Sequence, residues 1–140
     1  MRERPVGNET YDVVVVGSGA GGMSTAITAK KHGLSVAIIE KAAVFGGTTA
    51  FSGGVLWVPL THHTRDAGHD DSREAAIRYL KEETGNYFSA DMVEAYVDTG
   101  PKMVDFFERE TEVRFVPTLY PDYHPDVPGG VDVGRSILAA

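Results

Sequence analysis

Three glycines near the N-terminus have a spacing that suits the binding of a phosphate group. They are Gly17, Gly19 and Gly22, within the stretch VVVVGSGAGGM. The first glycine permits a sharp turn, the second lets a ligand approach the backbone, and the third lets a helix pack tightly on a strand. The amides and dipole at the N-terminus of that helix attract a pyrophosphate. We therefore expect these glycines, together with Ala20, to bind the pyrophosphate of a dinucleotide.

An acidic residue follows at the offset expected for contact with a ribose. Glu40 ends a second apolar run, LSVAIIE, about 20 residues after the last of these glycines, where an acid accepts hydrogen bonds from ribose hydroxyls. The glycine turn serves NAD and FAD equally, because both cofactors present a pyrophosphate and an adenosine ribose. On this motif alone, an NAD-binding domain is therefore an alternative to an FAD-binding one.

A second cluster of glycines and hydroxyls lies in the stretch EKAAVFGGTTAFSGGVLWVP. The acid–lysine pair, the short spacer, GGTT and SGG make it resemble the fumarate reductase/3-ketosteroid dehydrogenase family of flavoproteins. In that family the segment runs beside the pyrophosphate and ribityl chain of FAD and reaches the isoalloxazine ring. Glycines allow close backbone approach there, and amides and hydroxyls bond phosphate and ribityl groups. The resemblance implies these further FAD-binding residues: Lys41, Gly47, Thr48, Thr49, Ser52, Gly53 and Gly54.

Within this family, the segment is most similar to the 3-ketosteroid dehydrogenase branch. The specific part is Ser-Gly-Gly, which is followed by an apolar pair and then by Trp57 and Pro59. Some relatives attach FAD covalently through a histidine just before the threonine of this segment. Gly47 holds that position here, and His62 and His63 lie too far downstream. The resemblance therefore implies non-covalent FAD.

A loop rich in tyrosine and proline, YPDYHPDVPGGVDVGRS, also resembles this branch. A tyrosine in the family's loop reaches the substrate pocket, and Tyr123 matches that position best, followed by Tyr120. The family reaction introduces a carbon–carbon double bond beside a ketone: a tyrosinate-like base removes a proton, and the neighbouring carbon gives hydride to flavin N5. A tyrosine with its ordinary pKa near ~10 is a poor base at neutral pH. The resemblance implies a supporting catalytic role for Tyr123; the alternative is that both tyrosines only brace the loop.

A metal site is the other chemistry that the side chains suggest. The candidate ligands are His62, His63, His69, Asp70 and Asp71. Adjacent histidines in a loop are expected to point apart, and no helical His-x-x-x-His occurs, so we expect no metal. The chain has no cysteine, which excludes disulfides and thiolate metal sites.

Hydrophobic patterning predicts the elements that position the glycine turn. The run Tyr11–Val16 and the run that ends at Glu40 are typical of buried parallel strands. Small and apolar residues at helical spacing lie between them, and Gly33 is a suitable C-terminal stop for that helix. The sequence therefore predicts an α/β fold that begins with one Rossmann-like βαβ unit.

The later part of the chain departs from this alternation. Lys41 to Asp71 reads as a long segment without regular structure, and Ser72 is a good N-cap for a helix that ends at Gly85. A second helix follows over SADMVEAYVDTG, and Pro101 suits the first turn of a third. EVRFV predicts a short strand, residues 117–130 predict an extended loop, and GRSILAA begins an apolar, helix-compatible run.

Composition limits the classes of function. The chain has 140 residues and a formal net charge of -7, which argues against general binding to nucleic acid. No apolar run approaches the ~20 residues that span a bilayer, and the polar start MRERPVGNET is not a signal peptide. We expect a cytoplasmic protein. Residues 1–10 are expected to form a polar tail, and 11–140 the N-terminal part of an FAD-binding domain with a helical insertion at about 72–111.

The resemblance also implies that the fold is incomplete without the rest of a longer chain. Family members are several times longer and carry a separate substrate domain, and the general base and ketone-polarising groups belong to those regions. We expect this chain alone to bind FAD weakly and to be inactive, with a ketosteroid-like substrate for the whole enzyme. The alternatives are a fumarate reductase-like flavoprotein, or a non-catalytic FAD-binding module such as one subunit of a split enzyme whose partner chain supplies the substrate domain.

Overall fold

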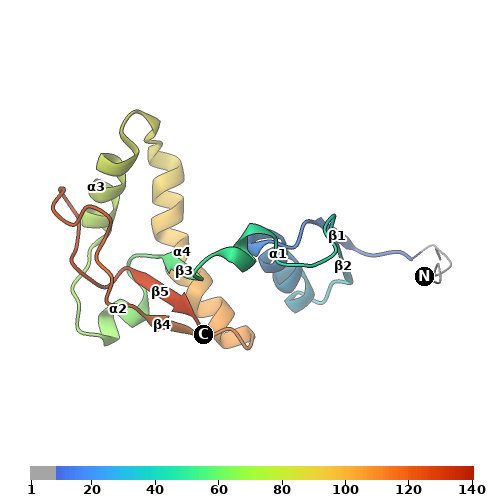
Figure 1. Ribbon diagram of the computed structural model, residues 1–140. Coiled ribbons are helices and arrows are strands. Elements are labelled where there is room, and N and C mark those ends of the chain that lie inside the picture. The colour runs from blue at the N-terminus through green and yellow to red at the C-terminus, as the bar shows by residue number, and fades with distance from the viewer. Residues whose placement is uncertain (1–8) are drawn as a thin grey trace. The chain divides into compact units, whose positions relative to one another are not determined.

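The computed structural model of the chain describes residues 9–140 (Figure 1). Most of the expected polar tail, residues 1–10, lies outside the described residues. The chain divides into two compact units, one that ends at Gly53 and one that spans Gly54–Ala140.

The first unit is a βαβ unit followed by one turn of 3₁₀ helix. Its elements are β1 (Val13–Val16), α1 (Ala20–Lys31), β2 (Val36–Ile39) and η1 (Gly47–Phe51). Strands β1 and β2 are parallel and in register, with Val13 opposite Val36 and Val16 opposite Ile39. The predicted strand–helix–strand order is confirmed.

Helix α1 ends as its sequence predicts, but the strands are only partly covered. Gly33 follows α1 with a φ of +85°, a conformation that favours glycine. Val15 is buried in the unit, whereas Val16 is 84% exposed and Ile39 is 56% exposed. We expected these strands to be buried on both faces. Instead, only one face is covered, and only α1 covers it.

The second unit combines a small antiparallel sheet with two long helices that lie side by side (Figure 1). The strand order is β3–β5–β4, so the last strand of the chain is the central one, and its Ile137 is fully buried. The elements are β3 (Val55–Trp57), α2 (His62–Asp66), α3 (Arg73–Thr84), η2 (Gly85–Tyr87), α4 (Ala90–Glu110), β4 (Phe115–Pro117) and β5 (Ser136–Ala139).

Three predictions for this part of the chain are wrong. The segment from Lys41 to Asp71 contains η1, β3 and α2 instead of lacking regular structure. The run GRSILAA forms β5, because its apolar residues are buried between two neighbouring strands rather than along a helix face. Pro101 does not start a new helix but lies inside α4, which is continuous.

The continuity of α4 follows from one buried face that runs through the proline. The buried residues are spaced by three or four positions, as on one side of a helix: Val97, Gly100, Val104 and Phe107. Burial along both halves offsets the hydrogen bond that the proline cannot make.

Other local predictions are confirmed. The Ser72 hydroxyl accepts a hydrogen bond from the Ala75 amide at 3.1 Å, and Gly85 ends α3. Of the loop expected over residues 117–130, residues 118–130 contain no helix or strand, whereas Pro117 belongs to β4. Among the described helices, none has the length and apolar character needed to cross a membrane.

Candidate functional site

The turn between β1 and α1 is too tight for any residue but glycine at position 22, the third glycine of the motif. A Cβ on Gly22 would lie 2.0 Å from the carbonyl oxygen of Gly17 and 3.3 Å from a methyl carbon of Val15. Gly17 itself has a φ of +94°. The glycine spacing therefore allows α1 to pack closely on β1, as the sequence predicts.

The N-terminus of α1 presents backbone amides without a competing acid. Gly19 is the N-cap and has no side chain to cap the helix, and the first turn contains no acidic residue. The Ala20 amide donates to the hydroxyl of Thr49 at 3.0 Å. Cβ atoms on Gly17 or Gly21 would meet nothing within 4 Å. The amides of Gly21 and Gly22 belong to the first helical turn, which has no intrahelical acceptor for them, and so they suit an anion.

Glu40 lies directly after β2 and is held by the glycine turn. Its carboxylate accepts hydrogen bonds from the Ser18 amide at 3.0 Å, the Ser18 hydroxyl at 2.5 Å and the Ala42 amide at 2.8 Å. The bond from the Ala42 amide, followed by those from Ser18, lowers the pKa of Glu40 to about 2. The group is therefore ionised at neutral pH. As an ionised carboxylate, Glu40 can only accept hydrogen bonds, which is the role that a ribose hydroxyl requires of its partner.

Ser18 is a residue of this site that the sequence analysis missed. It is only 2% exposed. Its hydroxyl donates to Glu40 and accepts from the Gly46 amide at 2.8 Å. Ser18 thus joins the glycine turn, the acid after β2 and the second glycine segment. The glycine pattern leaves this position unspecified, so no signal in the sequence marked it.

The second glycine segment folds against the first. Gly47 has a φ of +54°, and a Cβ there would lie 3.3 Å from the Cα of Gly19. Thr49 meets the start of α1 through its hydroxyl. The first unit therefore contains all but two of the predicted site residues: Gly17, Gly19, Ala20, Gly22, Glu40, Lys41, Gly47, Thr48, Thr49, Ser52 and Gly53. The remaining two, Gly54 and Tyr123, belong to the second unit.

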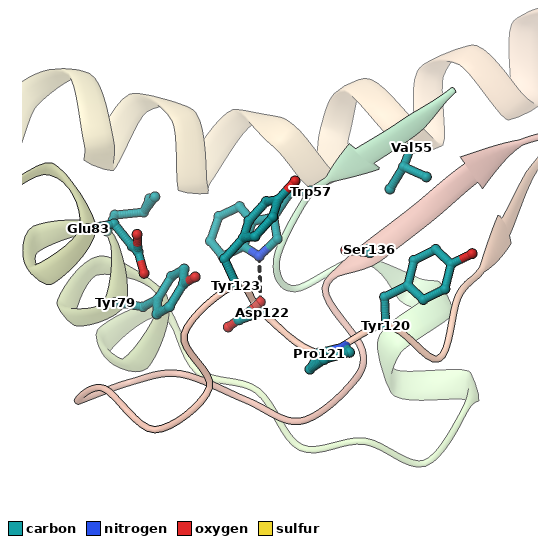
Figure 2. A pocket seen from close by; sticks show the side chains of 10 residues that line it. Val55, Trp57, Tyr79, Glu83, Tyr120, Pro121, Asp122, Tyr123 and Ser136 are labelled. Carbon is teal, nitrogen blue, oxygen red and sulfur yellow. Dashed lines mark hydrogen bonds between the residues drawn. The ribbon is translucent and has the colours of Figure 1, made fainter. Parts of the chain in front are cut away.

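The second unit has an aromatic hollow of about 610 Å³ (Figure 2). Trp57 of β3 stacks on Tyr79 of α3, with ring centroids 5.6 Å apart. Tyr120 and Tyr123 line the hollow from the loop after β4. Burial raises the pKa of Tyr79, so this tyrosine is not an activated base. The volume lies within the range of small-molecule sites.

The tyrosine expected to assist catalysis lies at the rim of this hollow. Tyr123 is 95% exposed, and its hydroxyl has no hydrogen-bond partner among residues 9–140. Figure 2 shows that the Tyr120 ring extends away from the stack of Trp57 and Tyr79. The Tyr123 hydroxyl is therefore available to form a hydrogen bond with a ligand.

A buried arginine holds the loop that carries these tyrosines. Arg135 donates to Asp122 at 2.9 Å and to Asp71 at 2.6 Å, and all three side chains are almost completely buried. Asp122 also accepts from the indole N–H of Trp57 at 2.6 Å (Figure 2). The Arg135 guanidinium lies 5.5 Å from the Trp57 ring centroid. Sequence analysis missed this network, because its members are far apart in the chain.

The adjacent histidines do not point apart as expected. His62 and His63 lie on the short helix α2, and their ring centroids are 4.0 Å apart. Both rings contact the carboxylate of Glu108 on α4, at 3.1 Å and 3.0 Å. The physical reason is that one carboxylate bonds to both imidazoles.

A family model described as "FAD binding domain" matches residues 12–135 of this chain. The match begins just before β1 and ends just before β5. It therefore includes the glycine turn, Glu40, the second glycine segment and the tyrosine loop.

Individual relatives are similar over nearly the whole chain. The chain is 45% identical over 129 residues to 4-oxocyclohexanecarboxylate 2-dehydrogenase of Sinomonas cyclohexanicum, covering 91% of this chain and 22% of that protein. It is 42% identical over 131 residues to 3-oxosteroid 1-dehydrogenase of Mycolicibacterium smegmatis, covering 92% and 23%. The chain thus spans about a fifth of the length of the curated relatives that it matches.

A solved structure has the same fold. It is the 3-ketosteroid delta1-dehydrogenase of Sterolibacterium denitrificans in complex with 1,4-androstadiene-3,17-dione. The TM-score is 0.85 at 38% sequence identity, and the match covers 93% of this chain and 23% of that one.

Proposed function

This chain belongs to the FAD binding domain family, and from that premise we propose that it is the FAD-binding portion of a dehydrogenase that introduces a double bond beside a ketone. The proposed substrate is 3-ketosteroid-like. The whole of residues 11–140 is proposed as the N-terminal part of that FAD-binding domain. Its relatives are dehydrogenases of cyclic ketones, which supports the reaction class.

One observation carries the proposal: the glycine turn, Glu40 and the second glycine segment meet through a single buried serine. Ser18 bonds to Glu40 and to Gly46, and Thr49 bonds to the start of α1. These contacts hold open amides, an ionised acid and hydroxyls in one place. Pyrophosphate, ribose and ribityl groups need those three kinds of partner.

Each part of the site has a proposed task toward FAD. The amides of the first turn of α1 would bind the pyrophosphate, and Glu40 would accept a hydrogen bond from the adenosine ribose. FAD, when bound, supplies the acceptor for the hydride that leaves the substrate. The residues proposed to bind the rest of the cofactor are Lys41, Gly47, Thr48, Thr49, Ser52, Gly53 and Gly54.

We propose that FAD is bound without a covalent link. A covalent bond through the segment would need a histidine where this chain has Gly47. Acid precipitation of the loaded protein tests this point, because non-covalent flavin stays in the supernatant.

A cytoplasmic location, and a partner chain if the enzyme is split, also belong to the proposal.

Tyr123 is proposed to support the catalytic base rather than to act as the base. Its exposed hydroxyl can donate a hydrogen bond to a tyrosinate outside the described residues and so lower the pKa of that group. The hollow beside it has a size and aromatic lining that suit a cyclic ketone. The buried Arg135–Asp122 pair positions its loop.

A chimera tests this function with a defined background. Residues 12–135 would replace the matching segment of the Mycolicibacterium smegmatis 3-oxosteroid 1-dehydrogenase. Flavin content and dehydrogenation, with a dye as electron acceptor, would be measured on a 3-ketosteroid and on 4-oxocyclohexanecarboxylate. We expect the chimera to retain FAD and to oxidise the steroid. A folded chimera without flavin contradicts the FAD site, and oxidation of only the smaller ketone contradicts the steroid-like substrate.

The variant Tyr123→Phe separates catalysis from cofactor binding in this chimera. We expect slower turnover with unchanged flavin content. Tyr87→Phe is the control, because Tyr87 is also an exposed tyrosine but lies in η2, outside the hollow. Equal turnover in Tyr123→Phe and the parent chimera would overturn the assignment of Tyr123.

A further inference from the structure

The side chains of α2 and α4 bring together two imidazoles and a carboxylate in an arrangement of metal-ligand type. One donor atom from each of His62, His63 and Glu108 can be chosen so that all three lie within 4.8 Å of one another. The side chains of His63 and Glu108 are each 16% exposed. The cluster lies apart from the residues that line the aromatic hollow.

Neighbouring residues on a helix normally project in different directions. The rings of His62 and His63 instead converge on Glu108, which reaches them from α4. Glu108 is itself fixed, because its carboxylate accepts a hydrogen bond from the Phe115 amide of β4 at 2.9 Å. Three elements thus meet at these donor atoms.

The ring of His62 lies between two carboxylates. Its Nδ1 lies 2.9 Å from Asp105, and its Nε2 lies 3.1 Å from Glu108. Ionised carboxylates only accept hydrogen bonds, and a neutral imidazole has only one N–H. With Nδ1–H donated to Asp105, the lone pair on Nε2 would face the oxygen of Glu108. A metal ion bound at Nε2 would contact both of these atoms.

The surroundings of His62 are typical of a metal ligand. Metal-ligating histidines usually donate their other N–H to a carboxylate, which fixes the tautomer, and Asp105 does this for His62. Two imidazoles and one carboxylate form a donor set that suits zinc. Zinc binds such donors at about 2.0–2.2 Å in tetrahedral geometry, so three donor atoms within 4.8 Å of one another can share one ion after a small rearrangement of their side chains.

We propose that His62, His63 and Glu108 bind one divalent transition-metal ion of the zinc class, with Asp105 orienting His62. Such an ion, with water as its fourth ligand, links α2 to the C-terminal half of α4, and Glu108 connects it to β4 through the Phe115 amide. Its ligands are not among the residues proposed to bind FAD.

Zinc titration of the 140-residue chain tests the site directly. The chain is first stripped with a chelator and then titrated with ZnCl₂ against a chromophoric competitor. We expect one zinc per chain, and loss of this binding in His63→Asn and Glu108→Gln. Asp105→Asn is expected to weaken it about 10- to 100-fold, as for other residues that orient metal ligands. His124→Asn is the matched control, since His124 makes a single bond to Glu83 at 2.6 Å.

Stability provides a second readout that does not depend on the competitor. Trp57 is the only tryptophan and reports on the second unit. Zinc should raise the urea midpoint of its fluorescence in the parent chain and in His124→Asn but not in Glu108→Gln. The proposal is overturned if the parent chain binds no zinc. Equal zinc affinity in the parent chain, His63→Asn and Glu108→Gln would overturn it as well.

Discussion

At the scale of single residues, a buried arginine of the second unit neutralises two buried carboxylates. Arg135 pairs with Asp71 and Asp122, and none of the three side chains is more than 3% exposed. Arg135→Met is expected to destabilise the second unit by about 3–5 kcal/mol, because two carboxylates would stay buried without a cation. Urea unfolding followed by Trp57 fluorescence measures this change.

Arg73→Met is the matched control for Arg135→Met. Arg73 also bonds two carboxylates, those of Glu94 and Asp98, but its side chain is 38% exposed. Water screens these pairs, so the free energy of unfolding should hardly change. Similar losses in both variants would show that burial does not set the energy of the Arg135 network.

The acid of the proposed cofactor site makes a prediction about pH. Because the pKa of Glu40 is lowered from 4.5 to about 2, its ionised form stabilises the folded unit. That stabilisation is fully present above about pH 4.5 and is lost as the pH falls towards 2. Titration of the Glu40 carboxyl by NMR should give a midpoint far below 4.5, and the Ser18 amide shift should follow it. In Glu40→Gln the Ser18 amide should lose this titration. A midpoint near 4.5 would contradict the hydrogen bonding described above.

The sequence predicted some of these residues and not others. Glu40 could be predicted, since its distance from the glycine turn is part of a known pattern. Ser18 occupies a position that the pattern leaves open, although its two bonds organise the turn. Arg135 depends on contacts between distant loops, which local sequence does not encode.

At the scale of elements, the packing of α1 on the glycine turn decides whether the first unit forms. Gly22→Ala would place a methyl group 2.0 Å from the Gly17 carbonyl oxygen, so the helix must move. We expect Gly22→Ala to lose FAD binding and the native amide NMR spectrum of the first unit. Gly21→Ala is the control for folding alone, because its Cβ meets nothing within 4 Å and alanine favours a helix, so the native amide spectrum should be retained. Native packing in Gly22→Ala would contradict this account.

Local patterns predicted the first βαβ unit better than the second unit. Its strands and helix are neighbours in sequence, so periodicity and glycine signals are sufficient. Strand β5 is defined by its partners β3 and β4, which lie far upstream or across a long loop. Likewise, Pro101 indicates a helix start locally, while the buried face shared by both halves of α4 keeps one helix.

At the scale of the whole molecule, the strands of the first unit leave apolar side chains exposed to solvent. Val16 and Ile39 are β-branched residues of a parallel pair, yet both lie mainly in solvent. Parallel sheets are normally covered on both faces. The chain also spans about a fifth of the length of its curated relatives. We therefore expect strands that are covered on one face only to limit the FAD affinity of the 140-residue chain.

Calorimetric titration of the 140-residue chain with FAD, and separately with NAD⁺, distinguishes a flavin site from a general dinucleotide site. We expect weak binding of FAD at one site, no heat from NAD⁺ at the same concentrations, and no FAD binding by Gly22→Ala. Equal affinity for both cofactors, or FAD binding that persists in Gly22→Ala, would contradict a flavin site built on the glycine turn.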